Sequence, residues 1–315
     1  MAIPIKIKAL LWFLNRQKGP QLFELDPVAA RAGAQKTMEK VGGWLDYKAI
    51  ELPQVDDKSI SVRDGEISIR IYHPSTKKNL PMIMYFHGGG FVMRSIDSHD
   101  KVCRRICRDN DAIVVSVGYR LAPEFKFPIP VHDCYDATLW AVAHADKLGG
   151  DASRLVVMGD SAGANLSTAV CLMSRDLGGP KISFQVLIYP CTDGYLSSDS
   201  IVDFGEGYFL TKKMMEWFID HYKSSDEDLA SPYLSVWHAE NLSSLPPAFI
   251  LTAEYDPLKD EGMKYAERLR EAGNDVVFKE YEGMIHGFIS MPKLSKRILG
   301  TYKDIQKTLE PVFAG

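Results

Sequence analysis

Continuous apolar runs alternate with helical periodicity through most of the chain. The apolar runs are Met82 to Phe86, Ala112 to Tyr119 and Leu155 to Met158, and Phe184 to Tyr189, Ala248 to Glu254 and Val276 to Tyr281 are further predicted strands. Strands buried on both faces of a parallel sheet have this character. Helical spacing of apolar residues follows most of them, at Ser98 to Asn110, Val131 to Leu148, Ala162 to Ser174, Leu258 to Glu271 and about Leu294 to Leu309. The pattern predicts an α/β fold with helices on both faces of a mostly parallel sheet.

Two segments before these runs alternate apolar and polar residues instead. Ile50 to Val55 and Glu66 to Tyr72 therefore predict antiparallel edge strands, which brings the expected sheet to eight strands. The α/β core would then comprise residues 49–190 and 245–315.

The remaining segments give no strand signal. Residues 1–48 show helical periodicity that Gly19-Pro20 and Gly42-Gly43 interrupt. Residues 191–244 are largely polar and contain one helix-like stretch, Lys212 to Tyr222. We expect this N-terminal helical arm and this insertion to pack together as a cap over the carboxyl edge of the sheet.

Composition narrows the possible partners. The net charge of −4 and the pI near 6.1 come without any basic stripe, so we expect no nucleic-acid partner. No apolar run reaches the length of a membrane-spanning helix, so we expect no stable membrane insertion. The five cysteines are odd in number and fall within predicted elements, which favours reduced thiols in a cytoplasmic protein. No Cys or His spacing indicates a metal site.

The sequence GDSAG, residues 159–163, lies between the apolar run 155–158 and the helical stretch that begins at Ala162. A strand-to-helix turn of the form G-x-S-x-G strains its serine, and the flanking glycines leave room for the neighbouring backbone. The helix N-terminus behind the turn stabilises negative charge. We predict that Ser161 is an exposed nucleophile.

A nucleophilic serine needs a base, and the base needs an orienting acid. In a fold of this kind both follow the serine along the chain, with the histidine last. His286 follows the last predicted strand in a glycine-flanked loop, whereas His221 and His238 lie in the predicted cap. The prediction for the base is therefore His286.

Two aspartates compete for the role of the acid. Asp256 directly follows a predicted strand, and Pro257 holds it extended. The same pair would also suit the N-cap and first position of a helix. Asp193 follows the preceding strand, and spacing favours Asp256 over it without excluding it.

His87 to Gly90, which read HGGG, follow the strand Met82 to Phe86. Consecutive glycines let backbone N–H groups approach a ligand closely, and HGGG forms the oxyanion loop of lipases and esterases. We predict that the N–H groups of Gly88, Gly89 and Ala162 stabilise a tetrahedral oxyanion.

Five motifs now stand together: HGGGF at 87–91, YRLAPE at 119–124, GDSAG at 159–163, DPLKDEG at 256–262 and HGF at 286–288. They resemble those of the hormone-sensitive-lipase-like carboxylesterases, bacterial family IV, a branch of the α/β-hydrolase fold. The resemblance extends over nearly all of the chain from about residue 50. It implies Ser161 as nucleophile, His286 as base, Asp256 rather than Asp193 as acid, and the three oxyanion donors already named.

Two positions depart from the commonest pattern of that family. Arg94 stands where a glycine often follows HGGGF, and Ala164 stands where a glycine often follows GDSAG. We expect Arg94 to alter the loop and the mouth of the pocket. Asp160 we interpret as stabilising the turn, and Arg120 and Glu124 as structural pairing.

The cap is rich in aromatic and methionine side chains, which either line a substrate pocket or fill the interior of the cap. They are Tyr208, Phe209, Met214, Met215, Trp217 and Phe218. In the arm, the apolar residues between Ile3 and Leu14, with Lys6 and Lys8, suggest a lipid contact, although packing on the cap is the usual outcome for such a stretch.

We interpret the chain as a serine carboxylesterase for short- to medium-chain esters, without cofactor or metal, that forms an acyl-enzyme. Its activity should require His286 as a neutral imidazole that can accept the serine proton. The same triad would serve an amidase, peptidase or lactonase. A small-ligand receptor without catalysis is less favoured because all three triad members are present. The sequence is also compatible with a homodimer.

Overall fold

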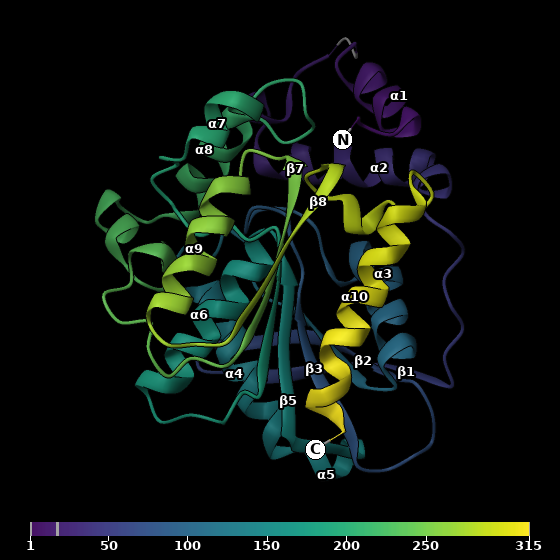
Figure 1. Cartoon of the computed structure of the whole chain (residues 1–315), viewed down its shortest axis with the longest axis vertical. Helices are drawn as coiled ribbons and strands as arrows, with labels where there is room; N and C mark the ends of the chain where they lie inside the picture. Colours follow the sequence, from purple (N-terminus) through teal and green to yellow (C-terminus); the bar gives the residue numbers. More distant parts are fainter. Residues whose placement is uncertain (1, 17–18, 315) are drawn as a thin grey trace.

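One sheet of eight strands runs through the protein (Figure 1). The structure, a computed structural model, describes residues 2–16 and 19–314. The strand order is β1-β2-β4-β3-β5-β6-β7-β8. The strands are β1 (Gln54–Val62), β2 (Gly65–His73), β3 (Leu80–Phe86), β4 (Ile113–Gly118), β5 (Gly150–Asp160), β6 (Phe184–Ile188), β7 (Ala248–Tyr255) and β8 (Val276–Ile285). β1 pairs antiparallel with β2, and β2 pairs antiparallel with β4, whereas the remaining strand pairs are parallel, so the predicted mostly parallel, eight-stranded sheet is confirmed.

Helices cover both faces of this sheet. On one face lie α4 (Ile129–Ala143), α6 (Ala162–Asp176) and α9 (Lys259–Glu271), and on the other lie α3 (Ile96–Asn110) and α10 (Lys296–Phe313) (Figure 1). The short helix α5 (Ala145–Leu148) precedes β5. Successive residues of a strand point to opposite faces, so Met84 of β3 joins one apolar core and Tyr85 the other. This two-sided burial explains why the central strands are apolar throughout.

Two local expectations were wrong. The first strand begins at Gln54, not at Ile50, and only Ile60 within it is buried. An outer strand with a single buried residue carries almost no hydrophobic pattern, and Pro53 has no N–H for a strand ladder. The second error concerns Gly42-Gly43. Helix α2 continues through both glycines, because each costs about 1 kcal/mol, which is too little to end a helix of 19 residues.

The N-terminal arm and the insertion lie near the end of the sheet where β7 and β8 finish (Figure 1). The arm contains α1 (Ile5–Leu14), η1 (Leu22–Glu24) and α2 (Pro27–Leu45). The insertion contains α7 (Asp199–Phe204), α8 (Lys212–Tyr222), η2 (Asp226–Ala230) and η3 (Val236–His238), and η4 (Phe288–Ser290) follows β8. Arm and insertion meet where the Asn15 amide donates to the Gly207 carbonyl at 3.1 Å and where Lys213 lies over the Phe23 ring.

The five cysteines are all unpaired, and all but Cys191 are fully buried. Among the helices of residues 2–16 and 19–314, none combines the length and apolar character that crossing a membrane requires.

Candidate active site

The turn between β5 and α6 holds Ser161 in a strained conformation. Its φ of 56° and ψ of −121° are values that residues with a side chain rarely adopt. Its N–H donates to the Ile188 carbonyl at 2.8 Å. A Cβ on Gly159 would lie 2.3 Å from the Gly163 oxygen, and one on Gly163 would lie 1.9 Å from the Phe86 oxygen. Contacts between backbone segments therefore fix the turn and require glycine on both sides of it.

Three predicted site residues form one chain of hydrogen bonds. The Ser161 hydroxyl lies 3.0 Å from His286 Nε2, and His286 Nδ1 lies 2.8 Å from Asp256 Oδ2. An ionised carboxylate only accepts, so Nδ1 carries the proton and Nε2 is left to accept from the serine. Asp256 is fully buried and His286 almost so. The serine comes from the turn after β5, the aspartate from the loop after β7, and the histidine from the end of β8.

The two functions considered for Asp256 coexist, one on each oxygen. Oδ2 accepts from His286, while Oδ1 accepts from the N–H of Leu258 at 2.9 Å, where α9 begins. The competing Asp193 lies elsewhere: it accepts from His238 Nε2 at 3.1 Å and from Ser197. Helix-starting contacts on Oδ1 thus hold the Asp256 carboxylate in the orientation that meets His286.

Asp160, beside the nucleophile, organises the loop that carries the three glycines. Its carboxylate accepts from the Tyr85 hydroxyl at 2.8 Å, from the N–H of Gly88 at 3.1 Å and from His99 at 3.2 Å. Burial alone would raise the pKa of Asp160, but His99 and these hydrogen bonds outweigh it and lower the pKa to about 2. Asp160 is therefore a permanent anion that ties HGGG to GDSAG.

This tie contradicts the predicted role of Gly88. Its N–H already donates to Asp160, so it is not available to an oxyanion. Within residues 2–16 and 19–314, the N–H groups of Gly89 and Gly90 have no acceptor. Ala162 is the first residue of α6, so its N–H has no partner inside the helix. In this loop and turn, the N–H groups without an acceptor among the described residues are therefore those of Gly89, Gly90 and Ala162. The sequence offered no signal that would choose among three consecutive glycines, because the choice depends on where Asp160 lies.

The insertion packs directly on the same loop. A Cβ on Gly90 would lie 2.2 Å from the Phe218 ring, and Phe91 stacks on Tyr222 with ring centroids 3.8 Å apart. Phe209 lies beside Gly287, next to the base. Met215 and Trp217 are instead buried within the protein. Of the cap's aromatic and methionine side chains, some therefore reach the loops of the site and others fill the interior.

Arg120 and Glu124 pair structurally, although not with each other. Arg120 forms an ion pair of 2.6 Å with the fully buried Asp133. Glu124 pairs at 2.7 Å with Arg31 of α2, which also donates to the carbonyl of Val92. Arg31 thus joins the N-terminal arm to the segment that follows the oxyanion loop.

Across the part of the chain that the structure describes, no group of three or more His, Cys, Asp or Glu side chains could hold a metal ion. The residues assembled around Ser161 bring together a hydroxyl, an imidazole, a carboxylate and backbone N–H groups.

The sequence profile of the alpha/beta hydrolase fold family matches residues 83–290, which include all of these groups. The chain belongs to this family. The α/β-hydrolase fold also agrees with two solved structures. An ester hydrolase from the metagenome of Lake Arreo is 38% identical, with a TM-score of 0.94 over 100% of both chains. A hyperthermophilic esterase from the archaeon Pyrobaculum calidifontis is 38% identical, with a TM-score of 0.93 over 99% of both chains.

Among curated α/β-hydrolases, the carboxylic ester hydrolase LipN of Mycobacterium tuberculosis is 43% identical over 279 residues. The matched region covers 85% of this chain and 72% of LipN. These relatives confirm the resemblance to the hormone-sensitive-lipase-like esterases that the motifs indicated.

Proposed function

We propose that this α/β-hydrolase is a serine carboxylesterase that acts through an acyl-enzyme. The observation that carries the proposal is the hydrogen-bonded chain Ser161–His286–Asp256, with distances of 3.0 and 2.8 Å. Its geometry suits proton transfer from the serine hydroxyl to the imidazole. The names of the relatives, carboxylic ester hydrolase and esterase, support an ester as the substrate.

In the first half-reaction, Ser161 Oγ attacks the ester carbonyl carbon while His286 Nε2 takes the hydroxyl proton. The carbonyl oxygen becomes an oxyanion, and the N–H groups of Gly89, Gly90 and Ala162 donate to it. Each such donor lowers the barrier by roughly 2.7–4 kcal/mol. Asp256 keeps the imidazole oriented and stabilises its positive charge. His286 then gives the proton to the departing alcohol, and the acyl group stays on Ser161.

In the second half-reaction, a water molecule takes the place of the alcohol. His286 removes one proton from the water as its oxygen attacks the acyl carbon. The same three N–H groups stabilise the second oxyanion. When the tetrahedral intermediate collapses, His286 returns the proton to Ser161 Oγ and the carboxylic acid leaves. The base therefore acts only when its Nε2 is free of a proton.

The proposal is tested by hydrolysis of p-nitrophenyl esters from acetate to palmitate. We expect turnover that is highest on short to medium acyl chains. Ser161→Ala should lower kcat on the order of a million-fold, whereas Ser61→Ala, on the exposed part of β1, should not change it. Near-parental rates in Ser161→Ala would show that the nucleophile lies elsewhere. Absence of turnover by the folded protein on every ester would overturn the esterase assignment.

A further inference from the structure

Arg94 is a cation without a partner next to the proposed oxyanion donors. A Cβ built on Gly89 would lie 2.7 Å from Arg94 Cγ, so the stem of the arginine packs on this glycine. Arg94 has a φ of 75°, a left-handed conformation that favours glycine. In the ranges that the structure describes, its guanidinium has neither a hydrogen-bond acceptor nor a carboxylate within 4 Å. The chain thus places an arginine in a backbone conformation that glycine would adopt without strain.

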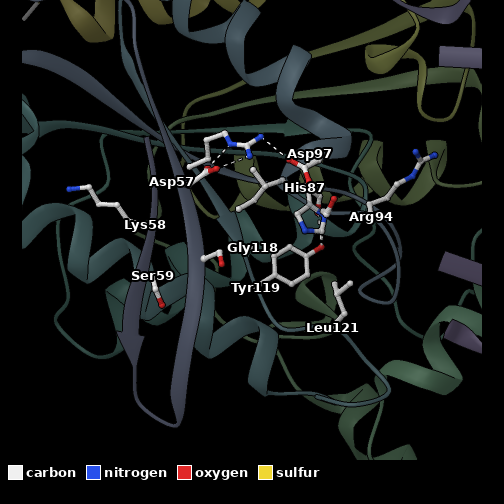
Figure 2. A pocket seen from close by; sticks show the side chains of 13 residues that line it. Asp57, Lys58, Ser59, His87, Arg94, Asp97, Gly118, Tyr119 and Leu121 are labelled. Carbon is white, nitrogen blue, oxygen red and sulfur yellow. Dashed lines mark hydrogen bonds and ion pairs between the residues drawn. The ribbon is translucent and has the colours of Figure 1, made fainter. Parts of the chain in front are cut away.

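A second arginine nearby, Arg70, has a guanidinium that is paired with carboxylates. Arg94 and Arg70 both line an open pocket of about 530 Å³ beside His87. Arg70 is paired with Asp57 at 2.7 Å, Asp97 at 2.8 Å and Asp100 at 3.4 Å. Figure 2 shows the Arg94 side chain pointing away from His87 and Tyr119, with no interaction drawn to it. Of these two arginines, only Arg94 has guanidinium donors without a partner among the described residues.

The surroundings of Arg94 link it to the nucleophile and the base. Burial lowers the pKa of Arg94, and the Asp160 carboxylate and the Tyr189 phenol oppose this shift. Asp160 precedes Ser161, and the Tyr189 ring packs on the His286 ring with centroids 4.7 Å apart. The Asp160 oxygens are already bonded to Tyr85, Gly88 and His99, as described above. Arg94 is half-buried, and an anionic ligand would offset the cost of a partly desolvated charge that has no bonded partner.

We propose that Arg94 is a specificity residue that binds a carboxylate on the substrate, so that the preferred esters carry an anionic group a few bonds from the scissile carbonyl. This inference rests on the proposed esterase function. The position of Arg94 suits this role, because its aliphatic stem packs on Gly89, whose N–H donates to the proposed oxyanion. A guanidinium also matches a carboxylate with two parallel hydrogen bonds, which Lys cannot form.

The test compares two esters with the same carbon skeleton between their carbonyl groups. Monoethyl succinate is an anion near neutral pH, and diethyl succinate is neutral. Ethanol release gives kcat/KM for each, and the ratio of monoester to diester isolates the charge. Arg94→Gln keeps a polar side chain and the backbone strain but removes the charge. We expect this variant to lower the ratio roughly 10- to 100-fold, the range for one charge-assisted hydrogen-bonded pair.

Two further variants separate recognition from general effects. Arg94→Lys keeps the charge and should recover part of the ratio. Lys58→Gln removes an exposed cation from the same pocket wall and should leave the ratio unchanged. Thermal unfolding of each variant shows that it is folded. A ratio unchanged by Arg94→Gln would overturn the proposal, whether or not activity falls. An equal loss on both esters would mean that Arg94 only shapes the loop.

If neither ester is hydrolysed, the proposed function fails, and succinate binding measured by calorimetry then decides the role of Arg94. Succinate that binds the parent protein at least tenfold more tightly than Arg94→Gln would support an anion site at Arg94. Equal binding to the two proteins would overturn it.

Discussion

The turn around Ser161 and the N-terminal arm are both close to the candidate site, yet the protein holds them in opposite ways. In the turn, Gly159 and Gly163 face backbone atoms so closely that no side chain fits. In the arm, Gly33 and Gly43 of α2 have open space where a Cβ would stand, and Ile5 of α1 is 79% exposed. Catalytic geometry depends on backbone contacts, which tolerate no added atom. The arm depends on separate side-chain contacts, most of which can change one at a time.

The largest expected effect on kcat comes from replacing the aspartate that orients His286. Asp256→Asn should lower kcat about 10⁴-fold, because an amide at this position no longer enforces the tautomer with the proton on Nδ1. Asp193→Asn is the matched control, since Asp193 is equally buried and also bonded to a histidine, His238. It should reduce stability but not turnover. Steady-state kinetics on p-nitrophenyl butyrate separate the two, and a similar kcat for both variants would refute the assignment of the acid.

A glycine-to-alanine pair tests the contrast between turn and arm directly. Gly163→Ala forces a methyl group to within 1.9 Å of the Phe86 carbonyl oxygen and should cost several kcal/mol of unfolding free energy, with a large loss of activity. Gly33→Ala meets nothing within 4 Å and should stabilise α2 by about 0.5–1 kcal/mol. Urea unfolding measures both. The comparison fails if Gly163→Ala is tolerated as well as Gly33→Ala.

Lowering the pH should destabilise the folded protein through titratable groups at the candidate site. Burial, aided by His99, lowers the pKa of His87 to about 3, far below the ordinary ~6.5 of the unfolded chain. Between these values the unfolded chain binds a proton that the folded protein does not, so stability is lost as the pH falls from 6.5 towards 3. The carboxylate of Asp160, with its pKa of about 2, adds a loss that begins below pH 4.

Titratable groups of the N-terminal arm should change stability with pH in the opposite direction. Residues 1–48 contain no histidine, and burial raises the pKa of Asp46, which works the opposite way. The free energy of unfolding measured against pH should therefore fall by a few kcal/mol between pH 6.5 and 3, and less in His87→Gln. An identical pH slope in that variant would show that His87 is not the source of the effect.

The smallest effect is expected at the outer face of the arm. Ile5→Ser should change the unfolding free energy by no more than about 0.5 kcal/mol, because the side chain is already in water. Ile7→Ala, two residues further on α1, removes a fully buried side chain and should cost about 2–5 kcal/mol. Equal costs in thermal unfolding would mean that the exposed face of α1 is covered in solution.

Local features of this protein could be predicted from its amino-acid pattern alone. Apolar runs and their spacing predicted the strands of the parallel sheet, and the predicted positions agree with β3 to β8 within a few residues, although β5 and β8 extend further than predicted. The order of Ser161, Asp256 and His286 after particular strands followed from the same pattern. Where burial was slight the pattern failed, as at β1, because an outer strand with one buried residue leaves little trace in the sequence.

The way in which distant groups share one site follows from the folded backbone and could not be predicted. Three equivalent glycines stand in a row, and the sequence could not show that Asp160 occupies the N–H of Gly88 and leaves those of Gly89 and Gly90 free. Nor could it show that, among the residues the structure describes, Arg70 pairs with three carboxylates while Arg94 pairs with none. Hydrogen bonds and ion pairs between distant segments depend on distances that the folded backbone sets. Local periodicity reports burial, but it carries no information about such pairs.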